Sequence, residues 1–363
     1  MSGTYPLKVV RRRRETEDTV SLWFDVPKDL ATPMTYRTGQ FIAVEEELGG
    51  ESVTRQYSLA SVPELDDRLQ ITVKRIPGGR MSTWLVDEVE EGDILEVESP
   101  RGRLYVPAEE PRHYLLIAAG SGIVPLAAIA RHVRHRARAD GIDHRVTLLY
   151  GNRHEDTIIL RGEVDDLAAQ GVHVEHVLSR PPAGWTGATG HVDPGFLESR
   201  WDGLADERPL SVFLCGPEDF MDAAEKWLVE RGVPLDDIRK ESFDLVLNDD
   251  DSEPAMVVPA EAADDEEEDC FLLTAMLGGE EIEVTPEPGE RLLSALLRVS
   301  EDVPFSCQEG TCSSCIVRLT DGSVAVRPHV LQTLRPGDLG EGLILACLSQ
   351  ARTESVRIDF DDI

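Results

Sequence analysis

The first hundred or so residues carry short apolar runs, each of about the length of a β-strand. Proline, glycine and acidic residues separate these runs, as expected of turns. Short strands at this spacing favour a small antiparallel barrel. The predicted strands are Leu7–Val10, Thr19–Phe24, Phe41–Val44, Gln70–Val73 and Ile94–Val97.

The pattern changes from Tyr114 onwards. Leu115–Ala119 is a continuous apolar run, as in a strand that is buried on both faces of a parallel sheet, and a helix is expected from about Leu126 to Arg138. Strands and helices then alternate, which predicts a parallel sheet between two helix layers. The further predicted segments are the strands Val146–Tyr150, Val172–Leu178 and Ser211–Leu214 and the helices Leu160–Gln170 and Phe220–Arg231.

A polar stretch precedes the last part of the chain. Residues 244–269 lack periodicity and are rich in Asp, Glu, Ala and Pro, which predicts a linker. Beyond it we expect a helix at Glu290–Val299, whose apolar residues share one face. The expected strands there are Phe271–Leu277, Glu281–Thr285 and Ile316–Leu319, with a closing segment at Leu343–Leu348.

Length and pattern together predict a multi-domain protein of α+β and α/β class, since 363 residues exceed one compact core. The expected parts are an antiparallel β-barrel at 1–109, a parallel αβα domain at 110–243, an acidic linker at 244–269 and a third domain at 270–363.

Charge narrows the class of partner. The formal net charge is −33, and 18 acidic residues but no Lys or Arg lie between Glu241 and Glu290. A polyanion would be repelled, so nucleic acid is not expected as a partner. The acidic run is either a solvated tether or a surface that steers a basic redox partner. No apolar run approaches the roughly 20 residues of a membrane span, so we expect a cytoplasmic protein without a membrane partner.

Four cysteines form a spacing with chemical meaning. Cys307, Cys312 and Cys315 are followed by Cys347, which gives C-x4-C-x2-C and a distant fourth thiol. This is the spacing that holds a plant-type [2Fe-2S] cluster, and Gly310 suits the tight loop that three thiolates on one segment require. The alternative is a structural zinc site, but such sites usually pair two C-x2-C halves or add histidines. Only two cysteines remain, which is not a disulfide framework and agrees with a reducing compartment.

Three further segments are candidate sites for phosphate-bearing ligands. Gly120-Ser121-Gly122-Ile123-Val124-Pro125 lies between a buried strand and a helix, where two glycines permit close approach of a diphosphate. The turn Gly78–Ser82 opens a helix that runs through Glu88, and Arg55 is a nearby cation. Cys215-Gly216-Pro217 follows a predicted strand, at the sheet edge where open α/β folds bind ligands.

These motifs, in this order, resemble the ferredoxin–NADP reductase superfamily along nearly the whole chain. The resemblance is to the branch with a C-terminal plant-type ferredoxin domain, which supplies electrons to bacterial oxygenases such as phenylacetyl-CoA epoxidase and 3-ketosteroid 9α-hydroxylase. The matching residues are Gly39-Gln40-Phe41, Arg55-Gln56-Tyr57-Ser58, Gly78-Gly79-Arg80-Met81-Ser82, Gly120 to Pro125, Cys215-Gly216-Pro217 and the four cysteines.

The resemblance implies a role for each motif. The first two domains would be a FAD-binding barrel and an NAD(P)-binding domain, and the third would be a β-grasp ferredoxin domain whose cluster is held by Cys307, Cys312, Cys315 and Cys347. Arg55 would hold flavin phosphate beside Gln56, Tyr57 would pack on the isoalloxazine and Ser58 would lie near flavin N5. A pyrophosphate site at Gly78, Gly79, Arg80, Met81 and Ser82 would favour FAD over FMN. Gly120, Gly122 and Pro125 would contact the nicotinamide dinucleotide, and Cys215, Gly216 and Pro217 would line the place where nicotinamide meets flavin.

The expected activity follows from matching two kinds of electron transfer. NAD(P)H gives up two electrons as a hydride, a [2Fe-2S] cluster accepts one at a time, and a flavin does both. We therefore expect an NAD(P)H-dependent reductase that passes electrons to a separate oxygenase or hydroxylase, with Tyr57, Ser58 and Cys215 as candidate catalytic residues. Two alternatives are a self-contained reductase acting on a quinone or ferric chelate, and a zinc-stabilised interaction module. Tyr57 as an ordinary barrel aromatic and Cys215 as a small buried residue remain open as well.

The coenzyme is left open by the sequence. Selectivity is usually decided just after the second strand of the nucleotide domain, where an acid accepts ribose hydroxyls or a cation binds the 2′-phosphate. Asn152-Arg153-His154-Glu155-Asp156 occupies this place and carries both signs of charge.

Overall fold

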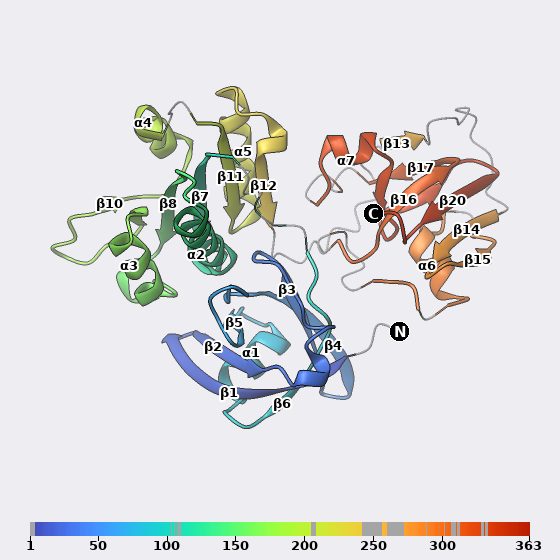
Figure 1. The fold of residues 1–363 in the computed structure, drawn as a ribbon, viewed down its shortest axis with the longest axis horizontal. Coiled ribbons are helices and arrows are strands. Elements are labelled where there is room, and N and C mark those ends of the chain that lie inside the picture. Colours follow the sequence, from blue (N-terminus) through green and yellow to red (C-terminus); the bar gives the residue numbers. More distant parts are fainter. Residues whose placement is uncertain are drawn as a thin grey trace. The chain divides into compact units, whose positions relative to one another are not determined.

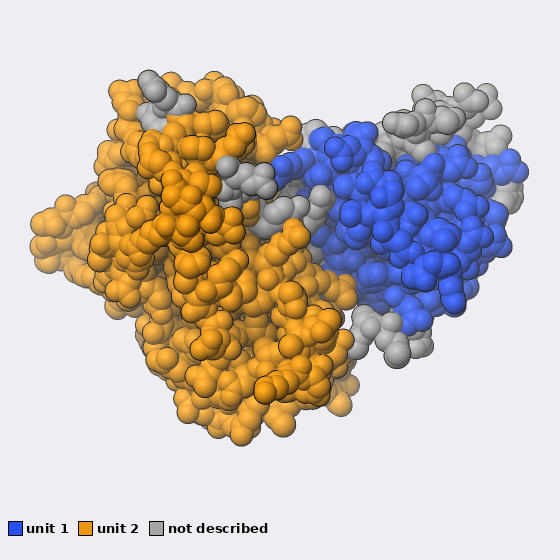
Figure 2. Space-filling view, viewed as in Figure 1, with its two compact units in different colours: residues 1–3, 245–363 blue, residues 4–244 orange. Residues whose placement is uncertain are grey.

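The computed structural model describes residues 4–102, 104, 106, 110–204, 208–241, 256–259, 272–287, 289–300, 302–305, 310, 313–327, 330 and 333–363. The chain divides into two compact units, shown in orange and blue in Figure 2. One unit is Thr4–Asp244, and the other is Leu245–Ile363 together with Met1–Gly3.

The larger unit begins with a six-stranded antiparallel sheet in the order β4-β3-β6-β1-β2-β5 (Figure 1). Leu59, just after edge strand β4, forms a bridge to Ile71 in the other edge strand, so the sheet closes on itself as a barrel. Alternate strand residues fill its core, and α1 (Arg80–Asp87) packs Met81 and Leu85 against them. The strands are β1 (Tyr5–Thr16), β2 (Thr19–Asp25), β3 (Phe41–Leu48), β4 (Glu51–Ser58), β5 (Leu69–Lys74) and β6 (Ile94–Val97).

A second, fully parallel sheet follows in the same unit, in the order β10-β9-β8-β7-β11-β12. Successive residues of β7 pack into different cores: Leu116 belongs to one apolar cluster, and Leu115 and Ile117 belong to another. The sheet is therefore buried on both faces, as its continuous apolar run predicts. The strands are β7 (His113–Ala119), β8 (Arg145–Asn152), β9 (His173–Leu178), β10 (Ala188–Thr189), β11 (Leu210–Cys215) and β12 (Ile238–Glu241).

Within the described residues four α-helices accompany this sheet, and the first of them positions the glycine loop. α2 begins at Ile123, immediately after the short 3₁₀ turn Gly120–Gly122, and lies against β7, β8 and β11. The helix therefore begins three residues earlier than the predicted start at Leu126, and Pro125 is its third residue. At this position the missing N–H of proline costs no intrahelical hydrogen bond. The helices are α2 (Ile123–Asp140), α3 (Arg161–Ala169), α4 (Pro194–Leu204) and α5 (Glu218–Glu230).

The smaller unit combines a five-stranded sheet, in the order β15-β14-β20-β16-β18, with a three-stranded sheet, β13-β17-β19. β14 and β20 are parallel and the other pairs are antiparallel, and α6 (Leu292–Leu297) packs Leu292, Leu293 and Leu296 into the shared core. The remaining elements are β13 (Met256–Pro259), β14 (Leu272–Leu277), β15 (Glu280–Val284), β16 (Ile316–Asp321), β17 (Ser323–Val326), α7 (Pro336–Gly340), β18 (Leu343–Leu345), β19 (Ser349–Ala351) and β20 (Ser355–Asp359).

Strand β13 lies inside segment 244–269, which the sequence predicts to be an acidic linker. Its backbone pairs with β17, from Met256 opposite Val326 to Pro259 opposite Ser323. Four residues of the predicted linker thus form a strand, because pairing with a distant strand outweighs the acidic local composition. The rest of 244–269 lies outside the described residues.

None of the helices in the described parts of the chain is long and apolar enough to cross a membrane.

Candidate functional site

Strand β4 carries the residues expected at a flavin, and its pairing decides how they face. Tyr57 lies opposite Ile42 and Arg55 opposite Val44, and both partners belong to the barrel core. Since paired residues share a face, Arg55 and Tyr57 lie on the same face of the strand, and Gln56 and Ser58 lie on the other. Tyr57 packs against the core, and burial raises the pKa of its phenol.

Arg55 remains available to an anion. It is exposed, and its guanidinium donates from Nη1 only to the carbonyl of Thr54, at 2.7 Å, within the described part of the chain. A guanidinium that is not already held by a carboxylate fits the role of a phosphate contact.

The turn at Gly78–Ser82 is built as a helix entry. Gly78 has φ +77°, which favours glycine, and Gly79 is the N-cap of α1. Ser82 accepts the Ile76 N–H at 3.1 Å, so its hydroxyl supports the turn. Arg80 pairs with Glu51 at 2.5 Å, and Met81 is buried in the core. The backbone of this turn fits a pyrophosphate, whereas Met81 serves packing.

The glycine loop after β7 is held from the neighbouring strand. Gly120 has φ +55°, and its carbonyl accepts a hydrogen bond from the Tyr150 hydroxyl at 3.1 Å. The same hydroxyl accepts the Ile159 N–H at 3.2 Å. No side chain among the described residues caps the N-terminus of α2. The positive end of the helix dipole and the side-chain-free backbone at Gly120 and Gly122 therefore fit a diphosphate.

Gly122 and Cys215 approach one another across the carboxyl edge of the sheet. A Cβ on Gly122 would lie 2.0 Å from the Cys215 carbonyl oxygen, so only glycine fits this position. A Cβ on Gly216 would lie 3.0 Å from both Ala119 and the Phe220 ring. β7 is also the strand at which the chain order reverses, since β8 and β11 flank it. Open α/β sheets bind their ligands at such a point.

Cys215 is fully buried beside a carboxylate. In the strand register it lies opposite Ala118 on one side and Glu241 on the other. Burial, and then the charge of Glu241, raise the pKa of its thiol well above the ordinary value. These surroundings favour the neutral thiol over the thiolate.

Glu241 links this edge to the barrel, and the sequence did not single it out. Ser58, at the end of β4, is 4% exposed and donates from its hydroxyl to Oε2 of Glu241 at 2.7 Å. Burial raises the pKa of the Glu241 carboxyl to about 7, although the Ser58 hydrogen bond opposes the shift. In the sequence Glu241 is simply the first member of an acidic run. Glu241 is the last residue of β12, a short strand of one apolar and three charged residues, so no local pattern in the sequence marks it.

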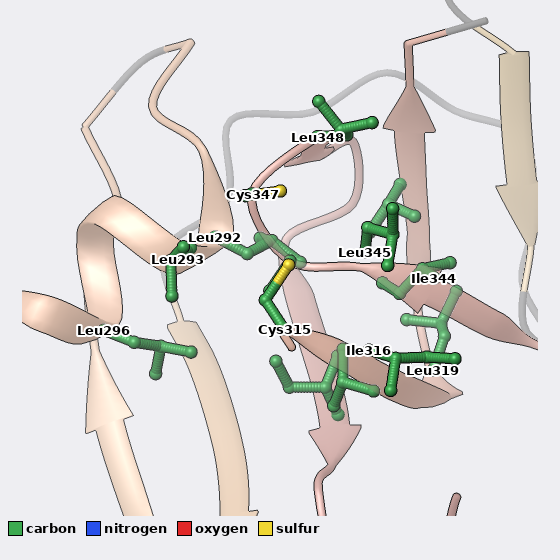
Figure 3. Close-up of a cluster of buried hydrophobic side chains, with 14 of the residues drawn as sticks. Leu292, Leu293, Leu296, Cys315, Ile316, Leu319, Ile344, Leu345, Cys347 and Leu348 are labelled. Carbon is green, nitrogen blue, oxygen red and sulfur yellow. The ribbon is translucent and has the colours of Figure 1, made fainter. Parts of the chain in front are cut away.

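The structure describes only part of the segment 307–315, which carries three of the four predicted cluster ligands. Cys315 and Cys347 are 2% and 1% exposed and lie in one apolar core, Cys315 directly before β16 and Cys347 just after β18 (Figure 3). The Ala346 N–H donates to the Cys315 carbonyl at 3.0 Å and ties the two segments together. Gly310 has φ +80°, and a Cβ there would lie 2.2 Å from Leu348 Cδ1. Cys307 and Cys312 lie outside the described residues.

These observations fit an iron–sulfur cluster. Thiols arriving from two elements meet inside one core, and the loop between the other cysteines contains a position that only glycine fills without strain.

The acidic and basic residues just after β8 differ in whether they have a partner of opposite charge. Glu155 forms an ion pair with Arg161 at 2.9 Å, and His154 Nδ1 lies 2.9 Å from the Arg180 carbonyl. Arg153 is exposed, and no carboxylate in the described part of the chain pairs with it.

Comparison with known families first defines the class of protein. Three family models match in order: an oxidoreductase FAD-binding domain over residues 6–105, an oxidoreductase NAD-binding domain over 116–226 and a 2Fe-2S iron–sulfur cluster binding domain over 275–352. The protein is therefore an NAD(P)H-dependent oxidoreductase that uses FAD and a [2Fe-2S] cluster.

Individual relatives then give the branch. The ferredoxin reductase component of 3-ketosteroid-9-alpha-monooxygenase from Mycolicibacterium smegmatis is 36% identical, over 99% of this chain and 98% of that protein. One component of the 1,2-phenylacetyl-CoA epoxidase of Escherichia coli is 30% identical, over 99% of both chains. The chain belongs to the ferredoxin–NADP reductase superfamily, in the branch with a C-terminal ferredoxin domain, as its motifs predict.

A solved structure agrees with the modular fold. Phthalate dioxygenase reductase, whose description is a modular structure for electron transfer from pyridine nucleotides to [2Fe-2S], matches with a TM-score of 0.57. The match covers 99% of this chain and 98% of that chain at 24% identity, so it bears on the fold alone.

Proposed function

We propose that this protein takes a hydride from NAD(P)H onto FAD and delivers the electrons, one at a time, through its [2Fe-2S] cluster to a separate oxygenase or hydroxylase. A relative of similar length is the reductase component of such a system by name. The observation that carries the proposal is the contact between Ser58 and Glu241, which brings the flavin strand to the carboxyl edge of the nucleotide-binding sheet. A nicotinamide bound at this sheet edge can then meet a flavin bound beside β4.

The barrel residues would hold the flavin. Arg55 would supply a charge-assisted contact to phosphate, Tyr57 would pack on the isoalloxazine, and Gln56 would contact the cofactor from the opposite face of β4. The Gly78–Ser82 backbone, with Gly79 and Arg80 at the helix entry, receives the pyrophosphate. Bound FAD supplies the two-electron to one-electron conversion.

The edge residues would receive the nicotinamide. Gly120, Gly122 and Pro125 form the diphosphate end, and Gly216 and Pro217 continue the edge beside Cys215. Cys215 contributes a neutral, compact wall that excludes water without adding charge. Ser58 orients its hydroxyl through Glu241, and Glu241 can hold or release a proton near pH 7.

The third domain would relay electrons through Cys307, Cys312, Cys315 and Cys347 as cluster ligands. We place the boundaries at 1–109, 110–243 and 270–363, which keeps the barrel and the parallel sheet within the compact unit Thr4–Asp244. We also place the protein in the cytoplasm, where reduced coenzymes are available and thiols remain reduced.

The proposal is tested by separating hydride uptake from one-electron delivery. The full chain should oxidise NAD(P)H with either ferricyanide or the purified oxygenase as acceptor. A chain that ends at Phe243 should retain FAD and the ferricyanide reaction and should not support oxygenase turnover, because the cluster is removed.

Two results would overturn this function. One is a full chain that fails to oxidise either coenzyme. The other is a shortened chain that supports the oxygenase as well as the full chain does. Rapid turnover of a quinone or ferric chelate by both proteins, without any oxygenase turnover, would favour a self-contained reductase instead.

A further inference from the structure

The two cofactor-binding parts of the larger unit are joined by a two-bond ion pair. Arg131, on α2, donates from Nη2 to Oδ1 of Asp66 at 2.7 Å and from Nη1 to Oδ2 at 2.9 Å. Arg131 also donates to the Ala60 carbonyl, at 3.4 Å. The two side chains are 25% and 27% exposed, so the pair is only partly screened by solvent. Paired guanidinium and carboxylate planes fix direction as well as distance.

The barrel end of this pair belongs to the loop that follows the flavin strand. Asp66 Oδ2 accepts the Val62 N–H at 2.8 Å, and the Asp66 N–H donates to the Val62 carbonyl at 2.9 Å. The carboxylate therefore closes the loop while it receives Arg131. Ala60, two residues after Ser58, packs into the core of the nucleotide-binding domain. Displacing this loop would move the end of β4.

The other end of the pair belongs to the helix that carries the glycine loop. α2 starts directly after Gly122, so Arg131 is on the same rigid helix as the proposed diphosphate site. The 3₁₀ turn Gly120–Gly122 also lies against β5 of the barrel. A second ion pair, Arg13 to Glu163 at 2.5 Å, joins β1 to α3 elsewhere along the same boundary. Loss of Arg131 would therefore leave the domains joined but freer to rotate.

We propose that Arg131 and Asp66 are positioning residues that fix the approach of the bound nicotinamide to the flavin. This inference rests on the proposed function, because it assigns the pair to that hydride transfer. Hydride transfer depends steeply on separation, and a misplacement of about 1 Å can cost roughly 100-fold in rate. Neither residue touches the reacting atoms, so both act through α2 and through the loop after β4.

The test uses Arg131→Gln and Asp66→Asn in the full, flavin-loaded chain, with Arg75→Gln as the matched control. Arg75 also makes two bonds to one carboxylate, at 2.9 and 2.7 Å to Asp87, but both residues belong to the barrel. Anaerobic stopped-flow reduction of the flavin at saturating NAD(P)H should slow about 10- to 100-fold in the two variants, with little change in KM. Arg75→Gln should remain within about twofold of the wild type.

Two further measurements separate positioning from general stability. The double variant should be no slower than either single variant, since both remove one shared interaction. Arg131→Lys, which keeps the charge and loses the fork, should recover part of the rate. Amide exchange in the protein stripped of its cofactors should increase at Val62 and Asp66 in Arg131→Gln and stay unchanged in Arg75→Gln.

Equal flavin-reduction rates for Arg131→Gln and Arg75→Gln would overturn the inference and leave the proposed function intact. So would a loss that appears only as a raised KM. If Arg131→Gln fails to fold, Asp66→Asn alone decides, because asparagine keeps the loop-closing oxygen. A wild-type chain that does not oxidise NAD(P)H with ferricyanide would instead reject the proposed function itself.

Discussion

The hydroxyl of Ser58 donates a 2.7 Å hydrogen bond to Oε2 of Glu241, which lies 183 positions later in the chain. Ser58 is the last residue of β4 in the barrel, and Glu241 is the last residue of β12 in the parallel sheet. The bond therefore places a buried proton-binding carboxyl beside the residue that the superfamily resemblance assigns to flavin N5.

This pair predicts a pH dependence of stability. Burial raises the pKa of Glu241 from 4.5 to about 7 in the folded protein. Its contribution to stability is thus fully present below about pH 4.5 and is lost as pH rises through 7. Glu241→Gln should unfold like the wild type at pH 5 and should be more stable at pH 8, by roughly 3 kcal/mol at most. Urea unfolding curves between pH 5 and 8 test this, and parallel stability curves for the two proteins would contradict it.

The same pair predicts a shift in the kinetic pH profile. The Ser58 hydrogen bond lowers the pKa of Glu241, so Ser58→Ala should move that pKa further upward. The flavin-reduction rate should titrate near pH 7 in the wild type, at higher pH in Ser58→Ala and not at all in this range in Glu241→Gln. Anaerobic stopped-flow rates from pH 6 to 9 give the three profiles. An inflection near pH 7 that persists in Glu241→Gln would assign the titration to another group.

Arg55 should govern flavin retention. Its guanidinium has no carboxylate partner within the described residues, so Arg55→Ala should weaken FAD binding about tenfold by removing one charge-assisted contact. Flavin fluorescence released on dilution measures the dissociation constant. Arg68→Ala is the control, because that exposed arginine is paired with Asp25 at 2.7 Å. Equal flavin loss in the two variants would argue against a specific role for Arg55.

The cysteine assignment predicts the metal content. Purified protein should hold about two irons and two labile sulfides per chain, and Cys312→Ser, Cys315→Ser or Cys347→Ser should lose or destabilise the cluster while FAD stays bound. The two cysteines outside this set are Cys215 and Cys270, and Cys215→Ser and Cys270→Ser should keep full iron content. Metal and sulfide analysis of anaerobically prepared protein checks both sets. Stoichiometric zinc without sulfide would replace the cluster assignment with a structural zinc site.

Coenzyme selectivity should follow the charges at the end of β8. Glu155 is held by Arg161, whereas Arg153 is exposed without a carboxylate partner in the described chain, so we expect a preference for the 2′-phosphate of NADPH. Arg153→Leu should lower kcat/KM for NADPH about tenfold and change the value for NADH little. Arg138→Leu, at the far end of α2, is the control. A wild-type preference for NADH would contradict the expectation.

Much of the order of elements could be read from local pattern. The apolar run of β7 is buried on both faces because its sequence offers no polar face, and the run at Ile94–Val97 forms β6 within the predicted bounds. The glycine loop and the cysteine spacing are equally local, since positive φ and thiolate geometry restrict residue type at fixed positions. These features also carried the family resemblance.

Strands that are stabilised by pairing with distant strands could not be predicted from the sequence. β4 is a polar edge strand that exists through its pairing with β3, and β13 exists through its pairing with β17. Neither stretch shows a clear alternation of apolar and polar residues from which a strand could be predicted. The stability of a strand depends on the neighbours with which it pairs.

The sequence by itself determined the cofactors and their order along the chain, because each motif is a short run whose chemistry requires particular residue types. Only the tertiary structure decided which groups act together. The Ser58–Glu241 bond and the Arg131–Asp66 pair each join residues far apart in the chain. No local pattern encodes such meetings: burial raises the pKa of Glu241 only once β12 lies beside Cys215 and the barrel covers its end.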